Sequence, residues 1–369
     1  MRVDRIELRL LRLPLVHPFR TSFGRTDEKT FILVRLLAGG LEAWGECVAG
    51  ATPYYSAETT VTAWHVLAEF LGPTLVGLDF GHPREVFPAF HAVRGHNMAK
   101  AALEMATWDL YARREGQPLS GVLGGIRTRI ASGVSIGIQE SFDQLAAKIR
   151  AELDAGYRRV KIKIEPGWDV DVVRRVRERF GDIPLMVDAN AAYTLGDADH
   201  LAALDAFGLM MIEQPLDEDD LTDHARLQRR LKTAICLDES IHSPRTARDA
   251  IDAGACRVVN IKPGRLGGFA ESIAVHDLCA AAGLPVWHGG MLESGIGRVH
   301  NIHLSALPNF TLPGDVAASR RYFVPDLVEP AVEVAPDGTI VVPTGPGLGV
   351  EVDADRIARA TLRFEALAR

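Results

Sequence analysis

Five residues that could bind a metal ion or move a proton recur at a nearly constant interval in the middle of the chain. They are two lysines and three acids, each in or directly after a short apolar segment: Lys163, Asp188, Glu213, Asp238 and Lys262. Successive members are 25, 25, 25 and 24 residues apart. One strand, one helix and two loops have this length and form the repeating unit of a parallel β/α barrel. Because the C-terminal ends of barrel strands meet at one mouth, we expect the five side chains to share one pocket.

The three acids predict a metal site. Three carboxylates cannot all stay ionised in a buried pocket without a cation, because like charges raise one another's pKa. Oxygen ligands with no Cys or His nearby favour Mg²⁺, with Mn²⁺ or another divalent cation as a substitute, over zinc. We therefore expect Asp188, Glu213 and Asp238 to bind Mg²⁺, which can stabilise the charge on a carboxylate substrate that loses its α-proton. Surface ion pairs on separate loops are the alternative for each acid.

The two lysines are candidate bases flanking that ion, and salt bridges to the three acids are the alternative. Lys161 shares a strand face with Lys163, because side chains alternate along a strand. A buried lysine acts as a base only when its pKa falls toward neutrality. We expect Lys161 to lower the pKa of Lys163 and to contact the substrate carboxylate. Arg265 either does the same for Lys262 or caps its own loop.

The elements that must position these residues are short strands alternating with amphipathic helices from residue 130 onward. This pattern predicts parallel strands joined by helical crossovers and closed into a barrel. We expect eight strands, at residues 133–138, 160–164, 185–190, 210–215, 234–240, 258–263, 285–290 and 309–313. Residues 144–155, 170–180 and 292–308 have helical patterns, but no helix is evident after the eighth strand.

A different pattern precedes the barrel. Residues 3–13, 31–37 and 41–48 read as antiparallel strands, and residues 57–75 and 97–115 as helices. The Pro/Gly-rich residues 320–369 are expected to return to this first domain. The predicted fold is therefore α/β, with an α+β capping domain of residues 1–125, completed by 320–369, and a catalytic barrel of residues 126–319.

Composition excludes several classes of protein. With 369 residues, 47% apolar and 24% charged, the chain is typical of a globular protein of two domains. A net charge of −7 without a Lys/Arg-rich segment argues against nucleic-acid binding. No apolar segment reaches 18 residues, so we expect no membrane span. Four scattered cysteines and no visible signal peptide predict free thiols in the cytoplasm.

The motifs around the five residues resemble those of the enolase superfamily, muconate-lactonizing subgroup. They are Lys161-Ile-Lys163, Asp188-Ala-Asn190, Glu213-Gln-Pro215, Asp238-Glu-Ser240 and Lys262-Pro-Gly-Arg265. Residues 164–170 (IEPGWDV), 190–197 (NAAYTLGD), 260–265 (NIKPGR), 289–295 (GGMLESG) and 307–315 (LPNFTLPGD) are similar to the N-succinylamino acid racemase/o-succinylbenzoate synthase family. The resemblance covers residues 5–350.

This resemblance implies a capping domain on a modified (β/α)₇β barrel, Mg²⁺ on the three acids, and removal of an α-proton from a small-molecule carboxylate. Lys163 and Lys262, on opposite sides of the ring, would racemise N-acyl (N-succinyl) amino acids. In a syn elimination of water that forms o-succinylbenzoate for menaquinone synthesis, Lys163 would act alone, with Lys262 as a nearby cation. The residues do not separate the two reactions. We also expect a homo-oligomer.

The remaining candidates are weaker. Phe19 and Phe23 lie between the first two strands, where the family's specificity loop is expected, although ordinary turn packing is the alternative. Tyr54-Tyr55 is a candidate second lid segment. Further pocket candidates by position are Ser135, Asn190, Met291, Glu293 and Ser294.

Other functions stay open as alternatives. Within the superfamily they are dipeptide epimerase and muconate cycloisomerase. A dipeptide epimerase typically carries D-x-D near the eighth strand, whereas this chain reads Leu312-Pro-Gly-Asp315, which counts against that activity. A non-catalytic scaffold is disfavoured because both lysines and all three acids are present. A Schiff-base aldolase would not need three metal-type acids.

Overall fold

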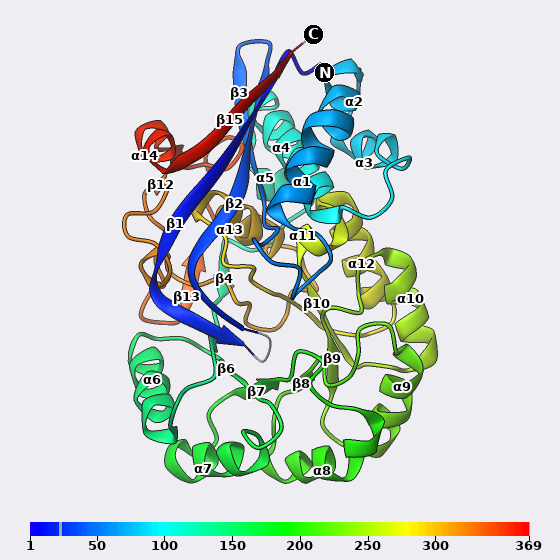
Figure 1. Cartoon of the computed structure of the whole chain (residues 1–369), viewed down its shortest axis with the longest axis vertical. Coiled ribbons are helices and arrows are strands. Elements are labelled where there is room, and N and C mark those ends of the chain that lie inside the picture. The colour runs from blue at the N-terminus through cyan, green and yellow to red at the C-terminus, as the bar shows by residue number, and fades with distance from the viewer. Residues whose placement is uncertain (22–23, 369) are drawn as a thin grey trace.

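A computed structural model describes residues 1–21 and 24–368. It consists of an antiparallel sheet with helices at one end of the molecule and a parallel barrel at the other (Figure 1). The first sheet has the order β15-β1-β2-β3, and the second, seven-stranded sheet has the order β11-β10-β9-β8-β7-β6-β5. The predicted α/β fold, a (β/α)₇β barrel with an α+β capping domain, is confirmed.

The capping sheet is built on a long hairpin. Its strands are β1 (Arg5–Thr21), β2 (Gly24–Ala38), β3 (Leu41–Cys47) and β15 (Thr361–Ala368). β1 and β2 extend beyond the predicted strands, because pairing resumes after an irregularity between Pro14 and Phe19 and continues to Thr21↔Gly24. The expected linker between the first two strands is therefore largely a two-stranded arm that reaches over the barrel (Figure 1).

Helices cover one face of this sheet. Residues 60–77 form a continuous helical stretch, with α1 (Thr60–Val66), a π-helical turn (Leu67–Leu71) and α2 (Gly72–Gly77), followed by α4 (Asn97–Arg114). α4 packs so closely on β3 that a Cβ atom on Gly45 would lie 1.9 Å from the carbonyl oxygen of Ala102. The C-terminal strand β15 pairs antiparallel with β1, from Arg5↔Ala368 to Leu11↔Thr361, so both termini lie at the capping end (Figure 1).

The barrel strands are shorter than predicted. They are β5 (Val134–Ile136), β6 (Val160–Lys163), β7 (Leu185–Asp188), β8 (Ile212–Glu213), β9 (Ile235–Leu237), β10 (Val258–Ile261) and β11 (Val286–His288). β7 and β8 stop early because Asn190 (φ 43°) and Gln214 (φ 38°) take left-handed backbone conformations. The polar residues of the predicted strand ends therefore lie in the turns that leave the barrel.

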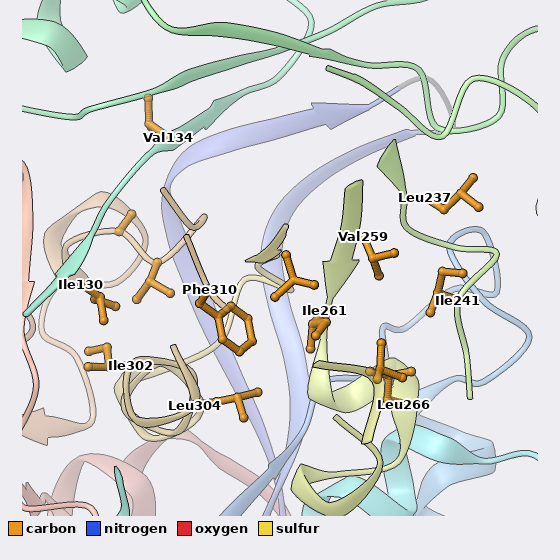
Figure 2. Packing of buried hydrophobic residues seen from close by; sticks show 14 of the residues in the cluster. Ile130, Val134, Leu237, Ile241, Val259, Ile261, Leu266, Ile302, Leu304 and Phe310 are labelled. Atoms are coloured by element: carbon orange, nitrogen blue, oxygen red, sulfur yellow. The ribbon is translucent and has the colours of Figure 1, made fainter. Parts of the chain in front are cut away.

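Helices surround the barrel, as expected for parallel crossovers (Figure 1). They are α6 (Phe142–Asp154), α7 (Val170–Phe180), α8 (Ala198–Ala202), α9 (Leu221–Arg230), α10 (Pro244–Ala253), α12 (Phe269–Ala281) and α13 (Gly295–Leu304). Apolar strand and helix side chains form one large cluster between the two layers. Figure 2 shows part of it, with Val259 and Ile261 of β10, Leu304 of α13 and Phe310.

The predicted eighth strand is wrong as a regular strand. Residues 309–313 form only a single parallel bridge, Val286↔Phe310, and the ring continues through the bridge Ser132↔Gly314. Pro308 precedes this segment and Pro313 ends it, and neither has an N–H to donate to a neighbouring strand. Asp315, directly beyond it, donates its backbone N–H to the His288 carbonyl oxygen at 2.7 Å.

The structure also bears on the state of the cysteines and on membrane-spanning helices. All four cysteines, Cys47, Cys236, Cys256 and Cys279, are buried free thiols, as predicted. No helix in the described part of the chain has the length and apolar character needed to cross a membrane.

Candidate active site

A cavity of about 550 Å³ separates the capping domain from the mouth of the barrel. The capping domain contributes Phe19 and the arm of β2, together with Tyr55 and its neighbours. The barrel contributes Lys163, Asn190, Lys262 and residues 290–292. The two candidate bases therefore face one common space.

The three acids come from neighbouring strands and lie below this space. Asp188 and Glu213 are the last residues of β7 and β8 and pair in register, while Asp238 directly follows β9. Lys163, at the end of β6, pairs in register with Asp188. All four side chains are buried. Strand ends thus bring together residues that are 25 positions apart in the sequence.

Each acid is paired with a lysine. Lys163 Nζ donates to Asp188 Oδ2 at 2.5 Å and to Asn190 Oδ1 at 2.6 Å. Lys161 Nζ lies 2.9 Å from Glu213 Oε2 and 3.2 Å from Asp188 Oδ2. The salt-bridge alternative for the lysines thus describes the contacts of this structure.

Lys262 stands on the other side of the ring. It directly follows β10, and three strands (β9, β8 and β7) lie between β10 and β6 in the sheet order. Its Nζ donates to Asp238 Oδ2 at 2.7 Å and to the Tyr55 hydroxyl at 3.0 Å. Arg265 also pairs with Asp238, and it donates to the Ile241 carbonyl at 2.6 Å. Arg265 therefore lies beside the Lys262–Asp238 pair and ties its own segment to the segment that follows β9.

The charges in the site are strongly coupled. Burial alone would raise the pKa of Asp188, but the ammonium groups of Lys163 and Lys161 outweigh it and lower the pKa. Burial, followed by the charge of Asp188, raises the pKa of Glu213 to about 7. The lysine charges therefore favour the ionised form of Asp188, whereas burial and the charge of Asp188 disfavour the ionised form of Glu213.

Lys262 does not show the lowered pKa that was expected of a base in this charge arrangement. Burial tends to lower the pKa of Lys262, but contact with Asp238 outweighs it and raises the pKa, while Arg265 opposes the rise. The pKa of Lys161 is raised in the same way, because Asp315, Glu213 and Asp188 outweigh its burial. A free amine at Lys262 requires that a positive charge besides Arg265 engage Asp238.

The donor set fits a hard divalent cation in chemistry, although not in its present arrangement. Among the described residues, no three His, Cys, Asp or Glu side chains are close enough to hold an ion as they stand. The lysine ammonium groups pair with the acids instead. Two buried acceptor atoms of this region, Asn260 Oδ1 and Glu239 Oε2, have no hydrogen-bond partner among these residues. Carboxylate and amide oxygens are among the ligands that Mg²⁺ and Mn²⁺ prefer.

The weaker candidates separate into two groups. Phe19, Asn190 and Met291 line the cavity, whereas Phe23 lies outside the described residues. Ser135 is buried on β5, away from the cavity lining. Glu293 is also buried and supports the wall from behind, since its Oε2 accepts from the Met291 backbone N–H at 2.9 Å.

Only one of the two tyrosines in the candidate second lid segment lines the cavity. Tyr54 is 65% exposed, while Tyr55 lines the cavity and contacts Lys262. Ser294 lies behind the wall as the N-cap residue of α13, and its hydroxyl donates to Glu46 Oε2 at 2.5 Å.

Sequence reasoning missed several residues around the lysines. Glu239 accepts from Asn190 Nδ2 at 2.9 Å, and Asp315 lies 2.8 Å from Lys161 Nζ. Arg159 pairs with Asp315 at 2.7 Å. Strand alternation would have placed Arg159 on the face of Lys161 and Lys163, but nothing in the sequence indicates the position of Asp315 below them.

Comparison with known proteins identifies the family. Residues 144–356 match the family model "Enolase C-terminal domain-like", and residues 5–124 match "Mandelate racemase / muconate lactonizing enzyme, N-terminal domain". The chain is 56% identical over 360 residues to an o-succinylbenzoate synthase of Geobacillus kaustophilus, covering 97% of this chain and 96% of that protein. It is 52% identical over 351 residues to an N-succinylamino acid racemase of Amycolatopsis sp, covering 95% of each.

Structural comparison agrees. A crystal structure of an enolase-superfamily member from Listeria innocua has a TM-score of 0.96 and 40% identity, and the match covers 100% of this chain and 99% of that one. The chain is therefore an enzyme of the enolase superfamily, in its mandelate racemase/muconate lactonizing enzyme family, and is similar to the o-succinylbenzoate synthases and N-succinylamino acid racemases of that family.

Proposed function

We propose that this enzyme removes the α-proton of a small carboxylate substrate, racemising N-succinylamino acids, forming o-succinylbenzoate by dehydration, or doing both. The observation that carries the proposal is that Lys163 and Lys262 line one cavity from opposite arcs of the barrel. A substrate between them meets one Nζ atom on each face. The relatives at 56% and 52% identity bear the names of these two activities.

Asp188, Glu213 and Asp238 are the proposed ligands of a divalent cation, Mg²⁺ or Mn²⁺. Enolase-superfamily enzymes generally use Mg²⁺. When bound, the cation supplies positive charge that offsets the negative charge on the substrate carboxylate. Lys161 contributes a further positive charge on the same side as the acids. Lys163 and Lys262 would then exchange their present acid partners for the substrate.

The two reactions differ in how the lysines are used. In racemisation, one Nζ, as a free amine, takes the α-proton, and the other, as an ammonium group, delivers a proton to the opposite face. In dehydration, Lys163 takes the α-proton and returns a proton to the departing hydroxyl group, which leaves as water. Lys262 then stays protonated and stabilises the intermediate electrostatically.

The test uses purified enzyme with Mg²⁺ and two substrate classes in D₂O. We expect deuterium at the α-carbon of N-succinylamino acids together with loss of optical activity, or loss of water from the hydroxy-carboxylate precursor of o-succinylbenzoate. Comparing kcat/KM for the two classes ranks the activities. Absence of exchange and of turnover with both classes would contradict the assignment.

Two structural expectations remain part of the proposal. We place the capping domain at residues 1–125 with 320–369, and the catalytic barrel at residues 126–319. We also propose that the enzyme is a homo-oligomer, which sedimentation velocity can measure directly.

A further inference from the structure

A buried salt-bridge network extends from the candidate site toward the barrel interior and contains a carboxylate that the proposed mechanism does not use. Asp315 follows the last barrel segment, and its side chain is 6% exposed. Its Oδ1 accepts from Arg159 Nη1 at 2.7 Å, and its Oδ2 lies 2.8 Å from Lys161 Nζ. One carboxylate therefore bridges two cations that are two residues apart along the chain.

The other members of the network are fixed in place. Arg159 also donates to the Pro313 carbonyl oxygen at 2.9 Å, and its side chain is 1% exposed. The Arg159 guanidinium and the Lys161 ammonium group both lie over the Trp287 ring, at 4.9 and 4.8 Å from its centroid. An aromatic face attracts cations, so Trp287 supports both of them. Two like charges on one ring need a counter-charge between them, which Asp315 supplies.

Lys161 is shared among three carboxylates. Its Nζ lies 2.8 Å from Asp315, 2.9 Å from Glu213 and 3.2 Å from Asp188. Glu213 and Asp188 are proposed cation ligands, so a bound cation competes with Lys161 for them. Asp315 alone among the three is free of that competition.

We infer that Asp315 is a positioning residue that holds the Lys161 ammonium group on the Trp287 ring and so leaves Glu213 and Asp188 available to a divalent cation. This inference rests on the proposed function. Without the carboxylate at position 315, Arg159 repels Lys161, whose remaining counter-charges are the two cation ligands. Lys161 then acts as an internal competitor of the metal.

The test is Asp315→Asn, with calorimetric titration of Mn²⁺ into the substrate-free full-length enzyme as the main measurement. We expect the Kd for Mn²⁺ to rise by roughly 10- to 100-fold, the range seen when a side chain that orients a metal site is removed. The kcat/KM for racemisation should fall as this Kd rises. Asp315→Glu should restore part of the affinity for Mn²⁺ and part of kcat/KM. Asp109→Asn is the matched control, because Asp109 is also fully buried and paired with an arginine (Arg113, 3.0 Å) but lies in the capping domain.

A second variant separates positioning from structural damage. If Asp315 acts through Lys161, then Lys161→Met combined with Asp315→Asn should return the Kd for Mn²⁺ to within about threefold of wild type, although activity stays low. A double variant that binds Mn²⁺ as weakly as Asp315→Asn does would overturn the inference. The inference would also be overturned if Asp315→Asn alone bound Mn²⁺ with wild-type affinity. If wild-type enzyme binds no Mn²⁺ and exchanges no α-proton, the proposed function fails as well. If wild type does both and the variants behave like it, only the inference fails.

Discussion

The protonation of Glu239 is a measurable consequence of its burial beside Asp238 and Asp188. Glu239 directly follows Asp238, its Oε1 accepts from Asn190, and its buried Oε2 has no hydrogen-bond partner in the described chain. Burial, followed by the charges of Asp238 and Asp188, raises the pKa of Glu239 from 4.5 to about 8. We therefore expect the folded, metal-free enzyme to keep Glu239 largely protonated at neutral pH, whereas the unfolded chain ionises it.

The sign and size of the effect follow from proton linkage. Between pH 4.5 and about 8 the folded state binds more protons at Glu239 than the unfolded state, so this residue makes stability fall as pH rises through that window. The difference between the two pKa values corresponds to roughly 5 kcal/mol at about 1.36 kcal/mol per pH unit. Glu239→Gln keeps the acceptor oxygen for Asn190 but cannot ionise. We expect it to exceed wild type in stability by about 3 kcal/mol at pH 7 and by about 1 kcal/mol or less at pH 5.

The assay is urea denaturation of both proteins in EDTA at pH 5, 7 and 8.5, with exposed Glu69→Gln as the control. Adding saturating Mg²⁺ should shrink the gain at pH 8.5, because the cation neutralises the carboxylates that repel the Glu239 charge. A gain that stays constant across the three pH values would refute the claim that Glu239 is protonated in the metal-free site.

Three further predictions concern the metal, the tyrosine and the domain packing. EDTA should abolish α-proton exchange and Mg²⁺ or Mn²⁺ should restore it; exchange that persists in EDTA would contradict the metal site. Tyr55→Phe removes the hydroxyl that lies 3.0 Å from Lys262, so we expect kcat to fall about tenfold without a change in thermal stability, and an unchanged kcat would count against a role for this contact. Gly45→Ala should lower the free energy of unfolding by about 1–3 kcal/mol, because the new Cβ would meet the Ala102 carbonyl. Gly77→Ala, with no atom within 4 Å, is its control, and equal unfolding midpoints would contradict the close approach.

Much of the fold follows from local patterns. Equal spacing and strand-like apolar segments predicted the barrel, because a strand, a helix and two loops have a nearly fixed combined length. The ends of the strands were harder to predict from the sequence, since the left-handed conformations of Asn190 and Gln214 depend on how each turn leaves the barrel. The arm formed by β1 and β2 was missed because Pro14 and Pro18 interrupt the alternating pattern that marks a strand.

The site was predictable in its members but not in their pairing. Alternation placed Lys161 and Lys163 on one face, and both are buried beside the predicted acids. The pKa of Lys262 depends on the contact with Asp238, which is 24 residues away in the sequence and adjacent in space. The roles of Asp315 and Glu239 were not predicted for the same reason, because a single acid in a loop gives no local sign that its partner is buried.

The central claim is that Lys163 and Lys262 serve opposite faces of one substrate. The most direct measurement is α-proton exchange in D₂O, followed by NMR, for each enantiomer of an N-succinylamino acid with wild type, Lys163→Met and Lys262→Met. We predict that each variant loses exchange roughly 10²- to 10⁴-fold for one enantiomer and retains it for the other, with opposite preferences. Loss of exchange for the same enantiomer in both variants, or full exchange of both enantiomers in either, would contradict the account.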